Sequence, residues 1–100
     1  MYIKTKFGAF EWDDAKAEYN FRKHEIRFTD AIRIFENRVY TYPSKGEHYE
    51  KREISIGILQ GVLVAAVVHT KRGKAKRIIS ARPADRDERA DFAAFIKSRH

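Results

Sequence analysis

"VLVAAVVHT", residues 62–70, is the stretch that decides the fold, together with "REISIGIL" at residues 52–59 just before it. The first is apolar at nearly every position, which predicts a central strand at residues 62–69 that is covered on both faces. The second alternates isoleucine with polar or small residues, the pattern of a strand with one buried face. Gln60-Gly61 between them predicts a tight turn, so the two strands run antiparallel.

Weaker patterns on either side predict three further strands. Large apolar residues alternate at residues 7–12, a short strand at residues 38–43 ends at Pro43, and "RIISAR" at residues 77–82 ends at Pro83. Proline has no N–H to donate to a sheet, so it ends a strand.

Helices are predicted at residues 13–24, 29–37 and 86–98, where apolar residues recur at helical spacing. Their caps are Asp13, Thr29 and Asp85, and Asp85 forms a capping box with Glu88. The order β-α-α-β-β-β-β-α with short turns predicts an α+β fold: an antiparallel sheet with two N-terminal helices and a C-terminal helix.

Length and composition narrow the class of protein. One hundred residues, 43% of them hydrophobic, predict a single domain at residues 1–100. The chain has no cysteine, and its longest apolar run is far shorter than the ~20 residues of a membrane helix. We therefore expect a cytoplasmic protein with no membrane contact. The formal net charge of +7 favours RNA or DNA as the partner.

The histidines point to no cofactor. His24, His48, His69 and His100 show no short metal-ligand spacing, so neither a metal site nor another cofactor is predicted. His24 shares a helix face with Lys23, an arrangement that also suits a plain solvated helix end. His69 closes the apolar strand and could be a structural residue or a proton acceptor near neutral pH.

Arginines frame the strand at residues 77–82. Simple alternation sends Arg77 to one face of the sheet and Arg82 to the other, and Arg52 opens another strand. Arginine is a bidentate clamp for phosphate, but charged residues also protect sheet edges from aggregation, and the two interpretations are about equal on the sequence alone. Four more basic residues lie at the tip of the hairpin at residues 70–76: Lys71, Arg72, Lys74 and Lys76.

Taken in order, these motifs resemble the BrnT toxin family of type II toxin–antitoxin systems, over about residues 10–92. The resemblance is carried by "FEWDDAKAEYNFRKHEIRF", "DAIRIFEN", "REISIG" and "HTKRGKAKRIISARPADRDER". It implies a RelE-like fold and a ribonuclease that arrests translation. It also implies a BrnA-like ribbon-helix-helix antitoxin, operator DNA bound only through that antitoxin, and a toxin homodimer within the complex.

The resemblance also implies roles for particular residues. Lys23 and His24 match the family's K-H, Arg52 matches the arginine of R-x-x-x-I-G, and Arg77 and Arg82 match those of R-I-I-S-A-R. Two positions depart from the pattern: Glu25 stands where the family usually has glycine, and Pro83 stands where many members have a basic residue.

We expect Arg82 and Arg77 to bind the phosphate with support from Arg52, because metal-free RNA cleavage needs cations around the phosphate and a proton acceptor near the 2′-OH. His24 is the first choice of base or acid, with Lys23 and His69 as alternatives. The basic hairpin tip would bind RNA. The rival hypothesis is a non-catalytic module that binds RNA or an antitoxin through the same basic surface.

Overall fold

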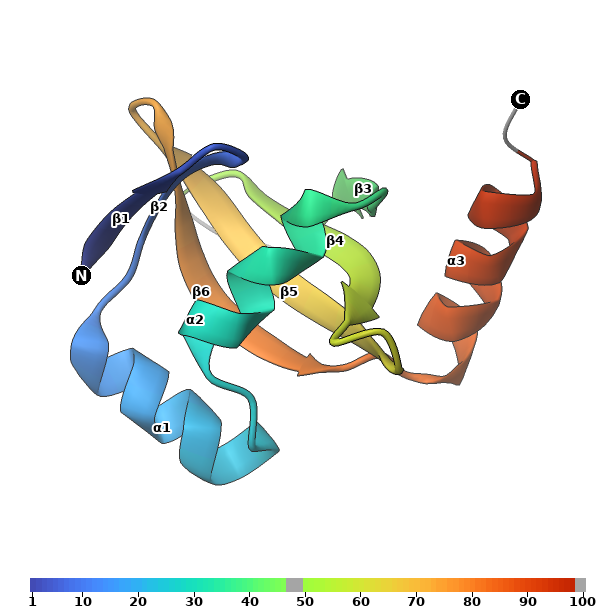
Figure 1. Ribbon diagram of the computed structural model, residues 1–100, viewed down its shortest axis with the longest axis horizontal. Coiled ribbons are helices and arrows are strands. Elements are labelled where there is room, and N and C mark those ends of the chain that lie inside the picture. The colour runs from blue at the N-terminus through green and yellow to red at the C-terminus, as the bar shows by residue number, and fades with distance from the viewer. Residues whose placement is uncertain (47–49, 99–100) are drawn as a thin grey trace.

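The computed structural model describes residues 1–46 and 50–98 and contains one mixed sheet with helices on both faces (Figure 1). The strands are β1 (Tyr2–Thr5), β2 (Gly8–Glu11), β3 (Tyr40–Pro43), β4 (Arg52–Leu59), β5 (Leu63–Arg72) and β6 (Ala75–Pro83). The helices are α1 (Asp14–His24), α2 (Phe28–Ala31), the 3-10 helix η1 (Ile32–Glu36) and α3 (Arg86–Lys97).

The strand order is β1-β2-β6-β5-β4-β3, which confirms the mostly antiparallel sheet and the interior position of β5. Gln60 and Gly61 both have positive φ, as the tight turn between β4 and β5 requires. One pairing was not predicted. A hairpin of β1 and β2 lies at the edge of the sheet, and β2 pairs with β6 in parallel.

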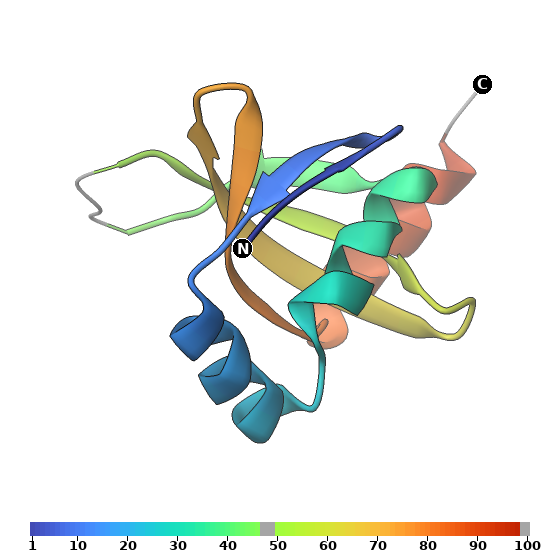
Figure 2. The ribbon, with the colours of Figure 1, turned by 60° about the vertical axis from the view of Figure 1, so that its left-hand side comes forward.

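Two clusters of apolar side chains hold the layers together. On one face of the sheet, α1, α2 and η1 cover Ala65, Val67 and Ile78 (Figure 2). On the other face, Phe92 of α3 packs against Ile56 and Ala66. The alternating strand β4 is therefore covered on both faces, and Ser55 and Ile56 are both fully buried.

Gly57 explains why η1 can lie so close to β4. A Cβ atom there would come within 2.9 Å of Ile34 Cβ and 3.1 Å of Val39 Cγ1. The backbone φ of Gly57 is an ordinary one, so glycine is needed at this position for close packing and not for its conformation.

The helix caps agree only in part with the sequence. Asp13 caps α1 by accepting from Ala15 N, and Asp85 and Glu88 form the predicted capping box of α3. Thr29 was wrongly predicted as a cap, since α2 begins at Phe28 after Arg27, which makes no side-chain cap. The predicted second helix is one turn of α-helix that tightens into η1, where Ile32 and Ile34 are buried.

Candidate functional site

Three arginines lie on the same face of the sheet, the face that α3 covers in part. Thr70 pairs with Arg52 on one side and with Arg77 on the other, and Ala66 pairs with Arg82. Cross-strand partners point to the same face. Because Thr70 and Ala66 are four residues apart on β5, all three arginines face the same way.

The prediction that Arg77 and Arg82 point to opposite faces is therefore wrong. The register of β5 and β6 shifts between Val68 and His69, so that Val68 pairs with Ser80 and His69 with Ile78. This β-bulge adds one residue to β6 and reverses the alternation beyond it.

Each of these arginines has a carboxylate partner. Arg52 Nε lies 3.3 Å from Glu50, and Arg77 donates to Glu11 at 2.6 Å. A guanidinium has five N–H donors, so each arginine keeps free donors for a second anion. The carboxylates fix the directions of the side chains and offset part of their positive charge.

Arg82 has the most constrained environment. Its two terminal nitrogens donate to both oxygens of Glu88, at 2.7 and 2.8 Å, and the Tyr42 hydroxyl donates to the same carboxylate at 3.2 Å. The hydrogen bond to Arg82 lowers the pKa of Glu88, and the same bond raises the pKa of Arg82. Burial, followed by the charge of Glu88, raises the pKa of Tyr42 to about 12, so Tyr42 stays a donor. The sequence identified Glu88 only as a cap, and nothing in it indicated Tyr42.

The end of α1 brings Lys23 and His24 toward Arg82. Asn20, one turn earlier, is buried, donates to the carbonyl of Ala81 at 2.8 Å and accepts from its N–H at 3.1 Å. Partial burial lowers the pKa of His24, and the charges of Lys23 and Arg82 lower it further. His24 is therefore mostly neutral at pH 7 and can accept a proton.

Glu25 ends α1 in the left-handed conformation, with φ 60°. Glycine adopts this conformation without strain, which gives a physical reason for glycine at this position. Glu25 adopts this conformation although it is not glycine, and its backbone N–H donates to the carbonyl of Phe21.

His69 lies on the opposite face of the sheet from the arginines. It is only 2% exposed, its Nε2 is 2.8 Å from Ser55 Oγ, and its ring meets that of Phe35 edge to face. Burial, with a contribution from the charge of Lys76, lowers the pKa of His69 to about 4. His69 is thus separated from the other candidate residues. His48 and His100 lie outside the described residues.

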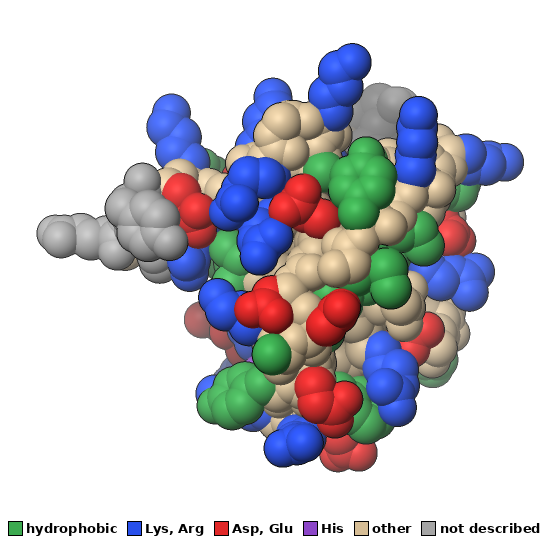
Figure 3. Space-filling model, turned by 90° about the vertical axis from the view of Figure 1, so that its left-hand side faces the viewer, with side chains coloured by type: hydrophobic (Ala, Val, Ile, Leu, Met, Phe, Trp, Pro, Cys, Tyr) green, Lys and Arg blue, Asp and Glu red, His purple; other side chains and the backbone are tan. Residues whose placement is uncertain are grey.

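The basic hairpin tip projects beyond the sheet (Figure 2). Lys71, Arg72 and Lys74 are exposed, while Lys76 lies over the Phe35 ring at 5.2 Å. Figure 3 shows Lys and Arg side chains crowding the upper part of one face of the molecule, with Asp and Glu side chains both among them and lower down.

Two structural absences apply to residues 1–46 and 50–98. No three His, Cys, Asp or Glu side chains in these segments are grouped so that they could hold a metal ion. None of the helices there is long and apolar enough to cross a membrane.

Comparison with known proteins gives an independent test. The structure is similar to the 1.1 Å crystal structure of the Brucella abortus ribonuclease toxin BrnT, with a TM-score of 0.64 and 29% sequence identity over 77% of this chain and 96% of that one. A search of curated proteins finds no match. The family model described as "Ribonuclease toxin, BrnT, of type II toxin-antitoxin system" matches residues 12–88. The chain therefore belongs to the BrnT family and is an endoribonuclease toxin, with a cognate antitoxin as its partner and RNA as its substrate.

Proposed function

We propose that this toxin cleaves RNA without a metal ion, at the arginine face of its sheet beside the end of α1. The observation that carries the proposal is the proximity of Arg82, a constrained bidentate donor, to His24, an imidazole whose pKa is lowered. RNA brings its own nucleophile, so the protein must supply a proton acceptor and cations around the phosphate.

In the proposed reaction, neutral His24 removes the proton of the ribose 2′-OH. The 2′-oxygen then forms a bond to phosphorus, the bond from phosphorus to the 5′-oxygen breaks, and the leaving oxygen takes up a proton. The products are a 2′,3′-cyclic phosphate and a free 5′-OH. Arg82 stabilises the charge that develops on the phosphate, and Lys23 is the alternative to His24 as the proton-transfer group.

In this proposal Arg77 and Arg52 act at a different position along the sheet from Arg82. They flank Thr70, which lies four residues from Ala66, the partner of Arg82. Four residues of a strand span about 13 Å, so these two arginines suit another phosphate of the same RNA, away from the one that is cut. The exposed tip residues Lys71, Arg72 and Lys74 then extend the RNA-binding surface, with Lys76 at the base of the tip.

The proposal also covers the toxin's effect on translation, its antitoxin and operator DNA. Cleavage of cellular RNA arrests translation in the cytoplasm. A ribbon-helix-helix antitoxin neutralises the toxin, pairs with a toxin homodimer in the complex and carries the contact with operator DNA.

The test is cleavage of purified, ribosome-free RNA in EDTA. We expect cleavage to persist in the chelator, with cyclic-phosphate ends, because no step uses a metal ion. The control is Arg22→Lys, a conservative change at an exposed arginine of α1, which should leave the rate unchanged. RNA that is bound but not cut by the wild type, or cut only when a divalent metal is restored, would refute the proposal.

A further inference from the structure

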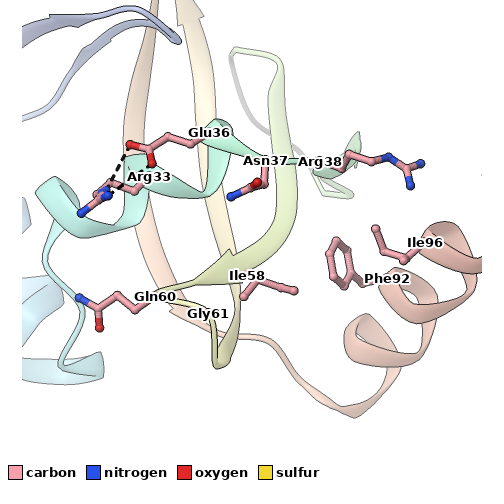
Figure 4. A pocket seen from close by; sticks show the side chains of 9 residues that line it. All are labelled: Arg33, Glu36, Asn37, Arg38, Ile58, Gln60, Gly61, Phe92 and Ile96. Atoms are coloured by element: carbon pink, nitrogen blue, oxygen red, sulfur yellow. Dashed lines mark hydrogen bonds and ion pairs between the residues drawn. The ribbon is translucent and has the colours of Figure 1, made fainter.

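A groove on the surface of the protein has no part in the proposed reaction. Its volume is about 550 Å³, and it lies between the residues that follow η1, the turn from β4 to β5, and α3 (Figure 4). Arg82 does not line the groove: it meets α3 at Glu88, in the first turn, whereas Phe92 and Ile96 of the later turns line it.

The floor of the groove is apolar. In Figure 4, Ile58 of β4 points toward Phe92 of α3, with Ile96 beside it. Ile58 is 42% exposed, and the neighbouring Val62 and Leu63 are 86% and 38% exposed. Ile58, exposed on the floor beside Phe92 and Ile96, gives an incoming molecule an apolar surface to cover, and Val62 lies exposed in the adjoining turn.

The position in the sheet makes this surface open. Pairing between β3 and β4 stops at Tyr40 and Ile56, so Gly57–Leu59 continue β4 beyond Tyr40, the first residue of β3. Within the described part of the chain, no other strand pairs with β4 on that side. An incoming segment can therefore approach both the strand edge and the apolar floor.

The rim of the groove carries positive charge. Arg38 lies over the Phe95 ring at 4.6 Å and, among residues 1–46 and 50–98, has no carboxylate within 4.0 Å. Arg33 stands on the other side and is paired with Glu36 at 3.2 Å. An apolar floor under an unpaired arginine suits a segment that carries apolar side chains with a carboxylate beside them.

We propose that this groove is the docking site for the cognate antitoxin, which inserts two or three apolar side chains over Ile58, Phe92 and Ile96 and places an Asp or Glu against Arg38. The apolar floor favours this occupant over RNA, because RNA offers phosphates for Arg38 but no apolar chain to cover Ile58. The assignment depends on the toxin's having an antitoxin and is independent of the roles given to Arg82 and His24.

The experiment measures calorimetric affinity for the cognate antitoxin, without RNA, for three variants. Ile58→Asp puts a charge on the floor, Val62→Asp puts one in the adjoining turn at an 86% exposed position that cannot disturb the core, and Arg38→Glu reverses the rim charge. Each should weaken binding about tenfold or more, because a few anchor residues supply most of the binding free energy at such interfaces. The matched controls on α1 are Tyr19→Asp, at a 65% exposed position, and Arg22→Glu, and both should bind as the wild type does.

RNA cleavage by the same samples separates this inference from the proposed function. All five variants should cut RNA at the wild-type rate, and the three groove variants should keep cutting when antitoxin is added. Wild-type affinity for Val62→Asp and Arg38→Glu would overturn the assignment. So would loss of self-association in these variants with antitoxin affinity unchanged, since the groove would then join two copies of this chain.

Discussion

Arg82 is both a structural and a proposed catalytic residue, and these two roles can be separated. Its ion pair with Glu88 joins the end of β6 to the first turn of α3, and Tyr42 adds a link to β3. A lysine would keep the charge but lose the two-pronged geometry. Substitution of Arg82 alone therefore mixes stability with activity, whereas substitution of Glu88 removes the ion pair and keeps the guanidinium.

We expect Arg82→Lys to fold and to lose RNA cleavage by roughly 10²-fold, the usual effect of removing one donor to a developing negative charge. Arg77→Lys should lose less. Glu88→Gln should lower the melting temperature as Arg82→Lys does but cut RNA within a few-fold of the wild type, because its arginine is intact. Melting curves and cleavage rates on the same samples decide the matter. Equal loss of cleavage in Arg82→Lys and Glu88→Gln would make Arg82 purely structural.

His69 makes stability depend on pH. Its pKa in the folded protein is about 4, below the ordinary value of 6.5. Between these two pH values, the unfolded chain therefore binds a proton at His69 more readily than the folded protein does. The free energy of unfolding should therefore fall as the pH drops from 6.5 toward 4, by up to about 3 kcal/mol, and it should not change above pH 7 on this account.

The measurement is urea unfolding at several pH values between 7 and 4.5. His69→Gln should be less stable at pH 7 but should lose most of the pH dependence. His24→Gln is the control, and it should retain most of the wild-type slope, because His69 carries the larger share. A wild-type slope that His69→Gln leaves unaltered would assign the dependence to other groups.

At the scale of elements, local patterns identified most strands and helices, while register depended on features that no pattern reveals. The alternation in "REISIGIL" and the apolar run after it predicted β4 and β5, but β5 runs from Leu63 to Arg72, and Val62, predicted to be buried, is 86% exposed. The bulge between β5 and β6 left no trace in the sequence, because Ile78, Ile79 and Ser80 read as ordinary strand residues. That single added residue decides which arginines share a face.

Asn20 illustrates a contact that helical spacing cannot predict. β2 pairs with β6 only along Ala75, Lys76 and Arg77, so the later part of β6 would be an open edge. The Asn20 amide closes part of that edge by bonding to both backbone groups of Ala81, and it also donates to the carbonyl of Ile26 at 3.1 Å. An amide side chain thus takes the place of a neighbouring strand.

We expect Asn20→Ala to lower the free energy of unfolding by about 3 kcal/mol, because it leaves buried backbone groups without partners. Urea unfolding measures the change. The matched control, Asn37→Ala, removes the same side chain at an exposed position and should cost less than about 0.5 kcal/mol. Similar losses in both variants would mean that Asn20 does not secure α1 to the sheet.

For the molecule as a whole, the sequence predicted the class and the meander of β3 to β6 but not the N-terminal hairpin. One strand is predicted at residues 7–12, whereas the structure has two near the N-terminus, β1 and β2. Parallel pairing of β2 with β6 joins segments more than sixty residues apart, and turn signals report only on neighbours in sequence. The family resemblance supplied what composition could not, namely the proposed roles of Lys23, His24 and the arginines.

The long sequence separations have a kinetic consequence. Arg77 meets Glu11 across 66 residues, and Asn20 meets Ala81 across 61. Contacts of this kind form late in folding, because a long loop must close first. While the chain is being synthesised, α1 and the first hairpin have no β6 to join. A nascent chain therefore brings the end of α1 and Arg82 of β6 together only when nearly all of it has been made, so the proposed site is incomplete during most of synthesis.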